Sequence, residues 1–148
     1  TKIFVLGELK MRIDHVAIAV TNVEQAVENF KKILKIDNIK TEEVSNEKVR
    51  VAILNLQDTR IELMEPTSEA SPIMKFLNER GEGLHHIAIT ADSIEQDTER
   101  ALQNGIKTLG GIRLGSYGRK ITFIHPKSMN GVLTELCEAV SEASEHNL

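Results

Sequence analysis

Short segments in which apolar and polar residues alternate recur along the chain, and this is the pattern of half-buried β-strands. The first covers residues 13–20, whose β-branched residues also suit a strand. Similar stretches lie at residues 48–56, 59–65, 119–125 and 131–137. The expected strands therefore fall into two groups, one in each half of the chain.

Helix signals follow the first strand of each half. In the first half, apolar residues at helical spacing define one buried face: Val23, Val27, Phe30 and Leu34. Asn22 and Ser93 stand where N-caps are expected, each with Gln three residues later, and Gly105 stands where the second helix would end. A further helix is expected at residues 71–81, with Pro72 in its first turn.

The two halves resemble each other in sequence. Residues 14–25 read DHVAIAVTNVEQ and residues 85–96 read HHIAITADSIEQ, with five of twelve positions identical at an offset of 71. Unrelated segments would share about one residue in twelve. The likeness continues from RIELMEP to LTELCEA, where Glu62 and Glu135 are 73 residues apart. The chain is therefore interpreted as a duplication.

Each copy has the expected element order β-α-β-β-β, which predicts an α+β fold of two tandem βαβββ modules in a single domain. The expected organisation is module 1 at about 11–66, a linking helix at about 71–81, module 2 at about 84–138, an extension at 1–10 and a polar tail at 139–148.

The duplication also pairs residues that can bind a metal. On alternating strands, His15 and His86 face a cleft kept open by small alanines, whereas His85 is expected on the opposite face. Glu62 and Glu135 interrupt apolar strands at matched positions, which is costly unless the carboxylate is paired or metal-bound. A single histidine or glutamate on a strand is more commonly a core or edge residue. The assignment of these four residues as metal ligands therefore depends on their matched positions in the two halves. The predicted ligands are His15, Glu62, His86 and Glu135.

Composition excludes several classes of protein. The 148 residues carry a net charge of −4 and only five aromatic side chains, which disfavours a nucleic-acid partner. No apolar run approaches a membrane span, so no membrane partner is expected. A single cysteine, Cys137, fits a reducing compartment and predicts a cytoplasmic protein, in which Cys137 packs as a small apolar residue. The Lys- and Glu-rich residues 40–50 are expected to be a solvated surface.

These residues resemble the vicinal oxygen chelate superfamily, also called the glyoxalase superfamily, and within it the methylmalonyl-CoA epimerase family. The segments IDHVAIAV, IELMEP, SPIMKFL, GLHHIAI and HPKSMNGVLTEL occur in that family's order across residues 12–137. The resemblance implies a curved mixed sheet around a metal cleft, a homodimer, and a divalent ion held by His15, Glu62, His86 and Glu135. Co²⁺ is the expected ion, with Mn²⁺, Ni²⁺, Zn²⁺ or Mg²⁺ as alternatives.

The resemblance further implies epimerisation of (2R)- and (2S)-methylmalonyl-CoA by α-proton abstraction through an enolate. Glu135 is the expected catalytic base, and Glu62 is expected to serve as the base on the opposite face of the substrate. Some family members carry another active-site Glu where this chain has Val51. The expected contacts with the coenzyme A phosphates are Arg119, Lys120 and Lys127, near the glycines Gly115 and Gly118.

Three alternatives remain open at this point. A glyoxalase I-type lactoylglutathione lyase uses the same ligand set. A non-catalytic binding protein of the same fold need not keep all four ligands, and an extradiol dioxygenase fits a fourth ligand at Glu62 poorly.

Overall fold

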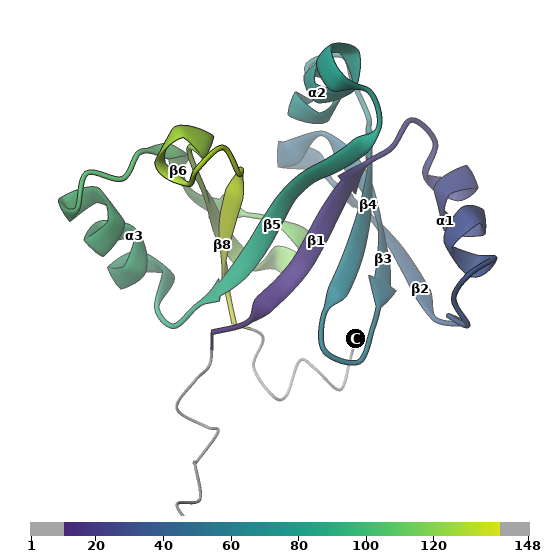
Figure 1. Cartoon of the computed structure of the whole chain (residues 1–148), viewed down its shortest axis with the longest axis horizontal. Helices are drawn as coiled ribbons and strands as arrows, with labels where there is room; N and C mark the ends of the chain where they lie inside the picture. Colours follow the sequence, from purple (N-terminus) through teal and green to yellow (C-terminus); the bar gives the residue numbers. More distant parts are fainter. Residues whose placement is uncertain (1–10, 140–148) are drawn as a thin grey trace, which may run out of the picture.

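A computed structural model describes residues 11–139, and these form one curved, eight-stranded mixed sheet (Figure 1). The strand order is β2-β3-β4-β1-β5-β8-β7-β6. The strands of the first half are β1 (Ile13–Ala19), β2 (Ile39–Val44), β3 (Val49–Asn55) and β4 (Arg60–Pro66). Those of the second half are β5 (Gly83–Ala91), β6 (Thr108–Leu114), β7 (Lys120–Ile124) and β8 (Thr134–Glu138).

The two halves repeat one βαβββ plan around the central pair β1 and β5, which run antiparallel. β1 pairs with β4 in parallel, and β5 pairs with β8 in parallel. Within these pairs Ala17 lies beside Glu62 and Ala88 lies beside Glu135. The duplicated sequence thus places each predicted Glu next to a strand residue with a very small side chain. The expected fold class is confirmed, and the expected extension at 1–10 and nearly all of the tail lie outside the described residues.

Helix α1 (Val23–Lys31) and helix α3 (Ile94–Gln103) begin at matched caps. Asn22 Oδ1 accepts a hydrogen bond from the Gln25 N–H at 2.8 Å, and Ser93 Oγ accepts one from the Gln96 N–H at 3.4 Å. Helix α2 (Pro72–Arg80) links the halves, with Pro72 in its first turn. No helix within residues 11–139 is long and apolar enough to cross a membrane.

The core of the first half forms on both faces of its sheet. One apolar cluster joins α1 to β3 and β4, with Val23, Leu54 and Leu63 fully or almost fully buried. A second cluster on the other face gathers Val51 and Ile73 with side chains of α2. Burial of such aliphatic side chains contributes roughly 1.5–3 kcal/mol each. The sheet that carries the cleft is therefore fixed from both sides.

Two matched bulges interrupt the central strand pair. The β1–β5 register skips Asp14 between Ile13 and His15, and it skips His85 between Leu84 and His86. A bulged residue is unpaired and need not obey strict alternation. The expectation that His85 faces away from His86 is wrong for this reason, since the two imidazoles are in contact.

The 3₁₀ turn that follows edge strand β2 contacts the opposite edge strand, β6. Asn46 Nδ2 donates to the Leu114 carbonyl at 2.6 Å. Arg113 pairs with Glu47, which lies in the 3₁₀ turn (Ser45–Glu47) after β2. Residues 40–50 are therefore more than a solvated surface, because this turn forms part of the cleft wall.

Candidate metal centre and substrate cavity

Four buried side chains converge where β1, β4, β5 and β8 lie side by side. His15 Nε2 lies 2.8 Å from Glu62 Oε2, 3.0 Å from Glu135 Oε2 and 3.3 Å from His86 Nε2. One ligand atom from each of His15, His86 and Glu135 lies within 4.8 Å of the others. Glu62 joins this group through its short distance to His15. The structure thus brings together all four residues that the repeat singled out.

The residues present fit a divalent cation. Glu62 Oε2 and Glu135 Oε2 are buried, and both crowd His15 Nε2, at 2.8 and 3.0 Å, with no hydrogen bond of regular geometry from the described residues. Buried carboxylate oxygens without donors are costly. A small cavity of about 30 Å³ lies against these side chains. Two imidazole nitrogens and two carboxylate oxygens form a donor set that suits first-row divalent metals.

A buried acid holds the imidazole of His15. Asp14 Oδ2 accepts a hydrogen bond from His15 Nδ1 at 2.7 Å, which leaves Nε2 directed at the centre. Arg60 and Arg119 both donate to Asp14, at 2.6 Å for Arg60 and at 2.8 and 2.9 Å for Arg119. Burial by itself raises the pKa of Asp14, but Arg119 and His15 outweigh it and hold this pKa well below its usual range. Asp14 is therefore a fixed negative charge behind the imidazole.

A neutral side chain holds the imidazole of His86. His85 Nδ1 lies 2.8 Å from His86 Nδ1, so Nε2 of His86 is again directed at the centre. Phe76 packs edge-on against His85, and Phe123 packs edge-on against His86. Burial lowers the pKa of His85 to about 4, with a smaller contribution from Arg80. In both halves the residue directly before the histidine lies in a strand bulge and contacts its Nδ1 atom. This residue is a carboxylate in the first half and a neutral imidazole in the second.

The two carboxylates differ in their surroundings. Ser116 donates a hydrogen bond to Glu62 Oε1 at 3.0 Å. Burial raises the pKa of Glu62, but the charge and hydrogen bond of His15 outweigh it, and this pKa is lowered. Burial and the nearby charge of Glu62 raise the pKa of Glu135. Glu135 is therefore the carboxylate that more readily accepts a proton.

The site favours positive charge. Burial lowers the pKa of His15, but the charge of Glu62 and the hydrogen bond with Asp14 raise it well above its ordinary value. Burial and the charge of His15 lower the pKa of His86 well below its ordinary value. One cation is thus favoured among these side chains, and metal ligation would require His15 to be unprotonated.

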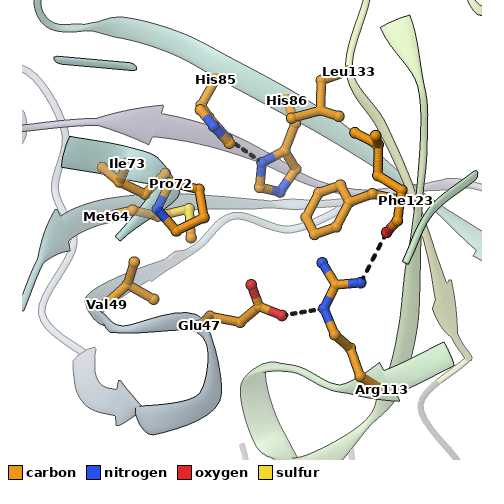
Figure 2. Close-up of a pocket in the computed structure, with 11 residues that line it drawn as sticks. Glu47, Val49, Met64, Pro72, Ile73, His85, His86, Arg113, Phe123 and Leu133 are labelled. Atoms are coloured by element: carbon orange, nitrogen blue, oxygen red, sulfur yellow. Dashed lines mark hydrogen bonds and ion pairs between the residues drawn. The ribbon is translucent and has the colours of Figure 1, made fainter. Parts of the chain in front are cut away.

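An apolar cavity of about 200 Å³ opens beside the four residues (Figure 2). Its walls include Val49, Met64, Ile73 and Leu133, and its inner end includes His86. The polar groups near its other side are Glu47 and Arg113, which form an ion pair with an Nε–Oε1 distance of 2.5 Å. Such a cavity suits a small, mostly apolar acyl group with a few polar atoms.

The cations expected near coenzyme A phosphates lie in different environments. Arg119 is largely buried and uses both Nη atoms on Asp14, so its geometry gives no support to a phosphate contact. Lys120 is half-exposed and pairs with Glu95 at 2.7 Å. Lys127 follows β7 in a short 3₁₀ turn (Pro126–Ser128). Lys120 and Lys127 therefore remain predictions.

The glycines between β6 and β7 have a local structural purpose. A Cβ on Gly115 would lie 2.9 Å from the Ile121 side chain, and Gly118 has φ +66°. Both conditions favour glycine whether or not a phosphate is near. The close turn that they permit brings Ser116 to Glu62.

Comparison with known proteins gives one consistent answer. Residues 14–123 match the model of the Glyoxalase/Bleomycin resistance protein/Dioxygenase superfamily. The chain is 35% identical over 130 residues to the human mitochondrial methylmalonyl-CoA epimerase, covering 86% of this chain and 74% of that protein. It is 34% identical over 128 residues to the ethylmalonyl-CoA/methylmalonyl-CoA epimerase of Cereibacter sphaeroides, covering 84% and 96% respectively.

A solved structure agrees with these relatives. A variant of the Streptomyces coelicolor methylmalonyl-CoA epimerase, in complex with 2-nitronate-propionyl-CoA, superimposes with a TM-score of 0.82 at 35% identity. The match covers 88% of this chain and 95% of that one. With its fold and its four converging side chains, the chain belongs to the Glyoxalase/Bleomycin resistance protein/Dioxygenase superfamily and, within it, to the methylmalonyl-CoA epimerase family.

Proposed function

We propose that this protein interconverts the (2R) and (2S) epimers of methylmalonyl-CoA. The observation that carries the proposal is a buried His15–Glu62–His86–Glu135 centre, one of whose members, His86, also lines an apolar cavity of about 200 Å³. Relatives of the same fold and about a third identical carry the name methylmalonyl-CoA epimerase. A glyoxalase I-type lyase uses the same ligand types but has no comparable support among these relatives.

The four residues would hold a divalent cation, with Co²⁺ proposed first and Mn²⁺, Ni²⁺, Zn²⁺ or Mg²⁺ as alternatives. When bound, such an ion supplies Lewis-acid stabilisation for the negative charge that develops on the thioester oxygen. Stabilisation of this kind contributes several kcal/mol, and each 1.4 kcal/mol or so changes a rate about tenfold. Asp14 and His85 would keep both imidazoles in the required orientation.

Glu135 is proposed as a base that removes the α-proton. The C2–H bond breaks, the proton passes to the carboxylate, and the electron pair delocalises onto the thioester oxygen of a planar enolate. Burial and the charge of Glu62 raise the pKa of Glu135, which strengthens it as a base. A positioned base contributes about 10²–10⁴-fold in rate, so Glu135→Gln is expected to lower turnover by at least about 100-fold.

Glu62 is better suited to holding a cation than to moving a proton. Its Oε1 accepts a hydrogen bond from Ser116, and its Oε2 lies 2.8 Å from His15 Nε2. Its lowered pKa also makes it the weaker base of the two carboxylates. We therefore propose Glu62 as a ligand first.

The test is incubation of the metal-loaded protein with methylmalonyl-CoA in D₂O, followed by NMR at C2. Deuterium uptake together with interconversion of the epimers, lost after chelation of the metal and regained on its return, is expected. A parallel incubation with methylglyoxal and glutathione reports on the lyase. Formation of lactoylglutathione without any exchange at C2 of methylmalonyl-CoA would overturn the proposal.

Assembly and cellular location belong to the proposal as well. Two curved half-sheets leave strand edges open, and Ile13 and Leu84 on the central strands are 47% and 71% exposed. We propose a homodimer in the cytoplasm, acting on a metabolite of propionate. Light scattering at two protein concentrations would report the mass, and a monomer at both would contradict the dimer.

A further inference from the structure

Epimerisation requires proton transfer on both faces of the reacting carbon. If Glu135 serves one face, a second group must reach the other, and this inference rests on the proposed function. Val51 is fully buried among apolar side chains and carries no proton to transfer. Glu62 has a donor on one oxygen and His15 beside the other. The second group must therefore come from elsewhere in the cavity wall.

Glu47 occupies a suitable place. It lines the small cavity that also contacts Glu135 and Glu62, and it lines the larger apolar cavity beside it. Figure 2 shows it across the cavity from His85 and His86, with one carboxylate oxygen toward Arg113 and the other toward the open space. Glu47 is therefore the carboxylate that borders both spaces without belonging to the converging group of four.

Arg113 is held in a fixed position and in turn holds Glu47. Its Nη1 donates to the carbonyls of Leu109 and Gly111 at 3.2 and 3.3 Å. Its guanidinium lies over the ring of Phe123, 5.1 Å from the centroid. Its Nε then donates to Glu47 Oε1, so the carboxylate has a defined orientation although it lies in a turn. Preorganisation of this kind is what a proton-transfer group requires.

We propose that Glu47 is the second proton-transfer residue and works on the face of the substrate opposite Glu135. In one direction Glu135 takes the proton from C2 and Glu47, in its protonated form, gives its own proton to the other face of the enolate. In the reverse direction the roles exchange. Repeated turnover in one direction requires Glu135 to lose its proton to water and Glu47 to regain one from water. The adjacent Arg113 keeps the carboxylate in place through both protonation states.

The test uses Glu47→Gln, which preserves size and an acceptor for Arg113. Each epimer is incubated separately in D₂O with the metal-loaded variant, and both deuterium uptake and configuration at C2 are followed. We expect interconversion to fall at least about 100-fold. One epimer should still exchange its proton with retention of configuration, through Glu135, while the other should exchange at least about 100-fold more slowly. Glu43→Gln, at an exposed position on β2, is the control and should behave as the unaltered protein.

Two results with Glu47→Gln would overturn the inference: exchange of both epimers at wild-type rates, or equal loss of exchange with both epimers while the metal content and far-UV spectrum are unchanged.

The unaltered protein offers a second measurement. Early product should carry solvent deuterium while recovered substrate carries none, whereas return of the substrate's own proton to the product would indicate a single base. A protein that exchanges neither epimer would contradict the proposed function itself, before Glu47 is at issue.

Discussion

Asp14 and His85 occupy equivalent positions 71 residues apart, each in a strand bulge directly before a converging imidazole. Each lies within hydrogen-bond distance of the Nδ1 atom of the histidine that follows it, at 2.7 Å for Asp14 and 2.8 Å for His85. The backbone device is the same in both halves, but the chemistry differs. One holder is a carboxylate bound by two arginines, and the other is a largely buried imidazole with a lowered pKa.

This asymmetry predicts unequal effects on metal affinity. Asp14→Asn should weaken Co²⁺ binding about 10–100-fold, because the negative charge that raises the basicity of His15 is lost. His85→Gln should weaken it less, because one neutral partner replaces another. Isothermal titration of the three proteins measures both effects. Asp58→Asn, in the exposed turn between β3 and β4, is the matched control and should leave the affinity unchanged. Equal loss in Asp14→Asn and His85→Gln would contradict the role given to the charge.

Arg119 provides a test of stability. Its two Nη atoms donate to buried Asp14, so Arg119→Met should lower the free energy of unfolding by about 3–5 kcal/mol. Lys120→Met breaks the exposed pair with Glu95 and should cost less than about 1 kcal/mol. Urea denaturation of the metal-free proteins compares the two. An Arg119→Met protein as stable as the wild type, but with weakened binding of coenzyme A, would restore the phosphate contact expected from the sequence.

The structure shows which part of this arrangement the sequence could reveal. The sequence identifies His15 and His86 because identical residues recur at one offset, and a duplicated fold brings equivalent positions together about an approximate axis. The alternation pattern does not predict the bulges, because strict alternation assumes an unbroken strand ladder. Alternation alone therefore places His85 on the wrong face.

Long-range pairing explains the remaining differences. Arg119 stands among glycines and another cation in the sequence, and nothing local indicates a buried acid 105 residues away. Glu47 appears in a charged stretch, and its place in the cavity wall depends on contact between the turn after β2 and strand β6, and these two strands are opposite edges of the sheet. Contacts of this kind follow from the closure of the whole sheet rather than from any one segment.

Cys137 gives a prediction about pH. Burial raises the pKa of its thiol to about 12, from an ordinary value of 9.0, and the charge of Asp14 acts in the same direction. The folded protein therefore keeps this proton at a pH where the unfolded chain releases it. Stability linked to the thiol is complete below about pH 9 and falls as the pH rises toward 12.

Labelling and denaturation check this prediction. A thiol reagent at pH 8 should modify the native protein at least about 100-fold more slowly than the unfolded chain. Urea midpoints at pH 8 and pH 10 should differ more for the wild type than for Cys137→Ala. Rapid labelling of the native protein would show that the thiol is neither buried nor protonated as described.

Ser116 links the β6–β7 turn to the converging carboxylates. Ser116→Ala removes the donor to Glu62 Oε1 and leaves this buried oxygen without it. We expect a loss of about 1–3 kcal/mol in the free energy of unfolding of the metal-free protein. Ser45→Ala, at an exposed position in the 3₁₀ turn after β2, is the control for loss of a serine hydroxyl. It should change the free energy of unfolding by less than about 0.5 kcal/mol. Equal stability of the two variants would contradict the contact.

The most direct test of the account is a calorimetric titration of the metal-free protein with Co²⁺. We expect one ion bound per chain, with binding abolished or weakened at least about 100-fold in His86→Ala and in Glu135→Gln. Absence of binding in the wild type, or undiminished binding in a protein that lacks both His15 and His86, would contradict a shared metal centre built from the two halves.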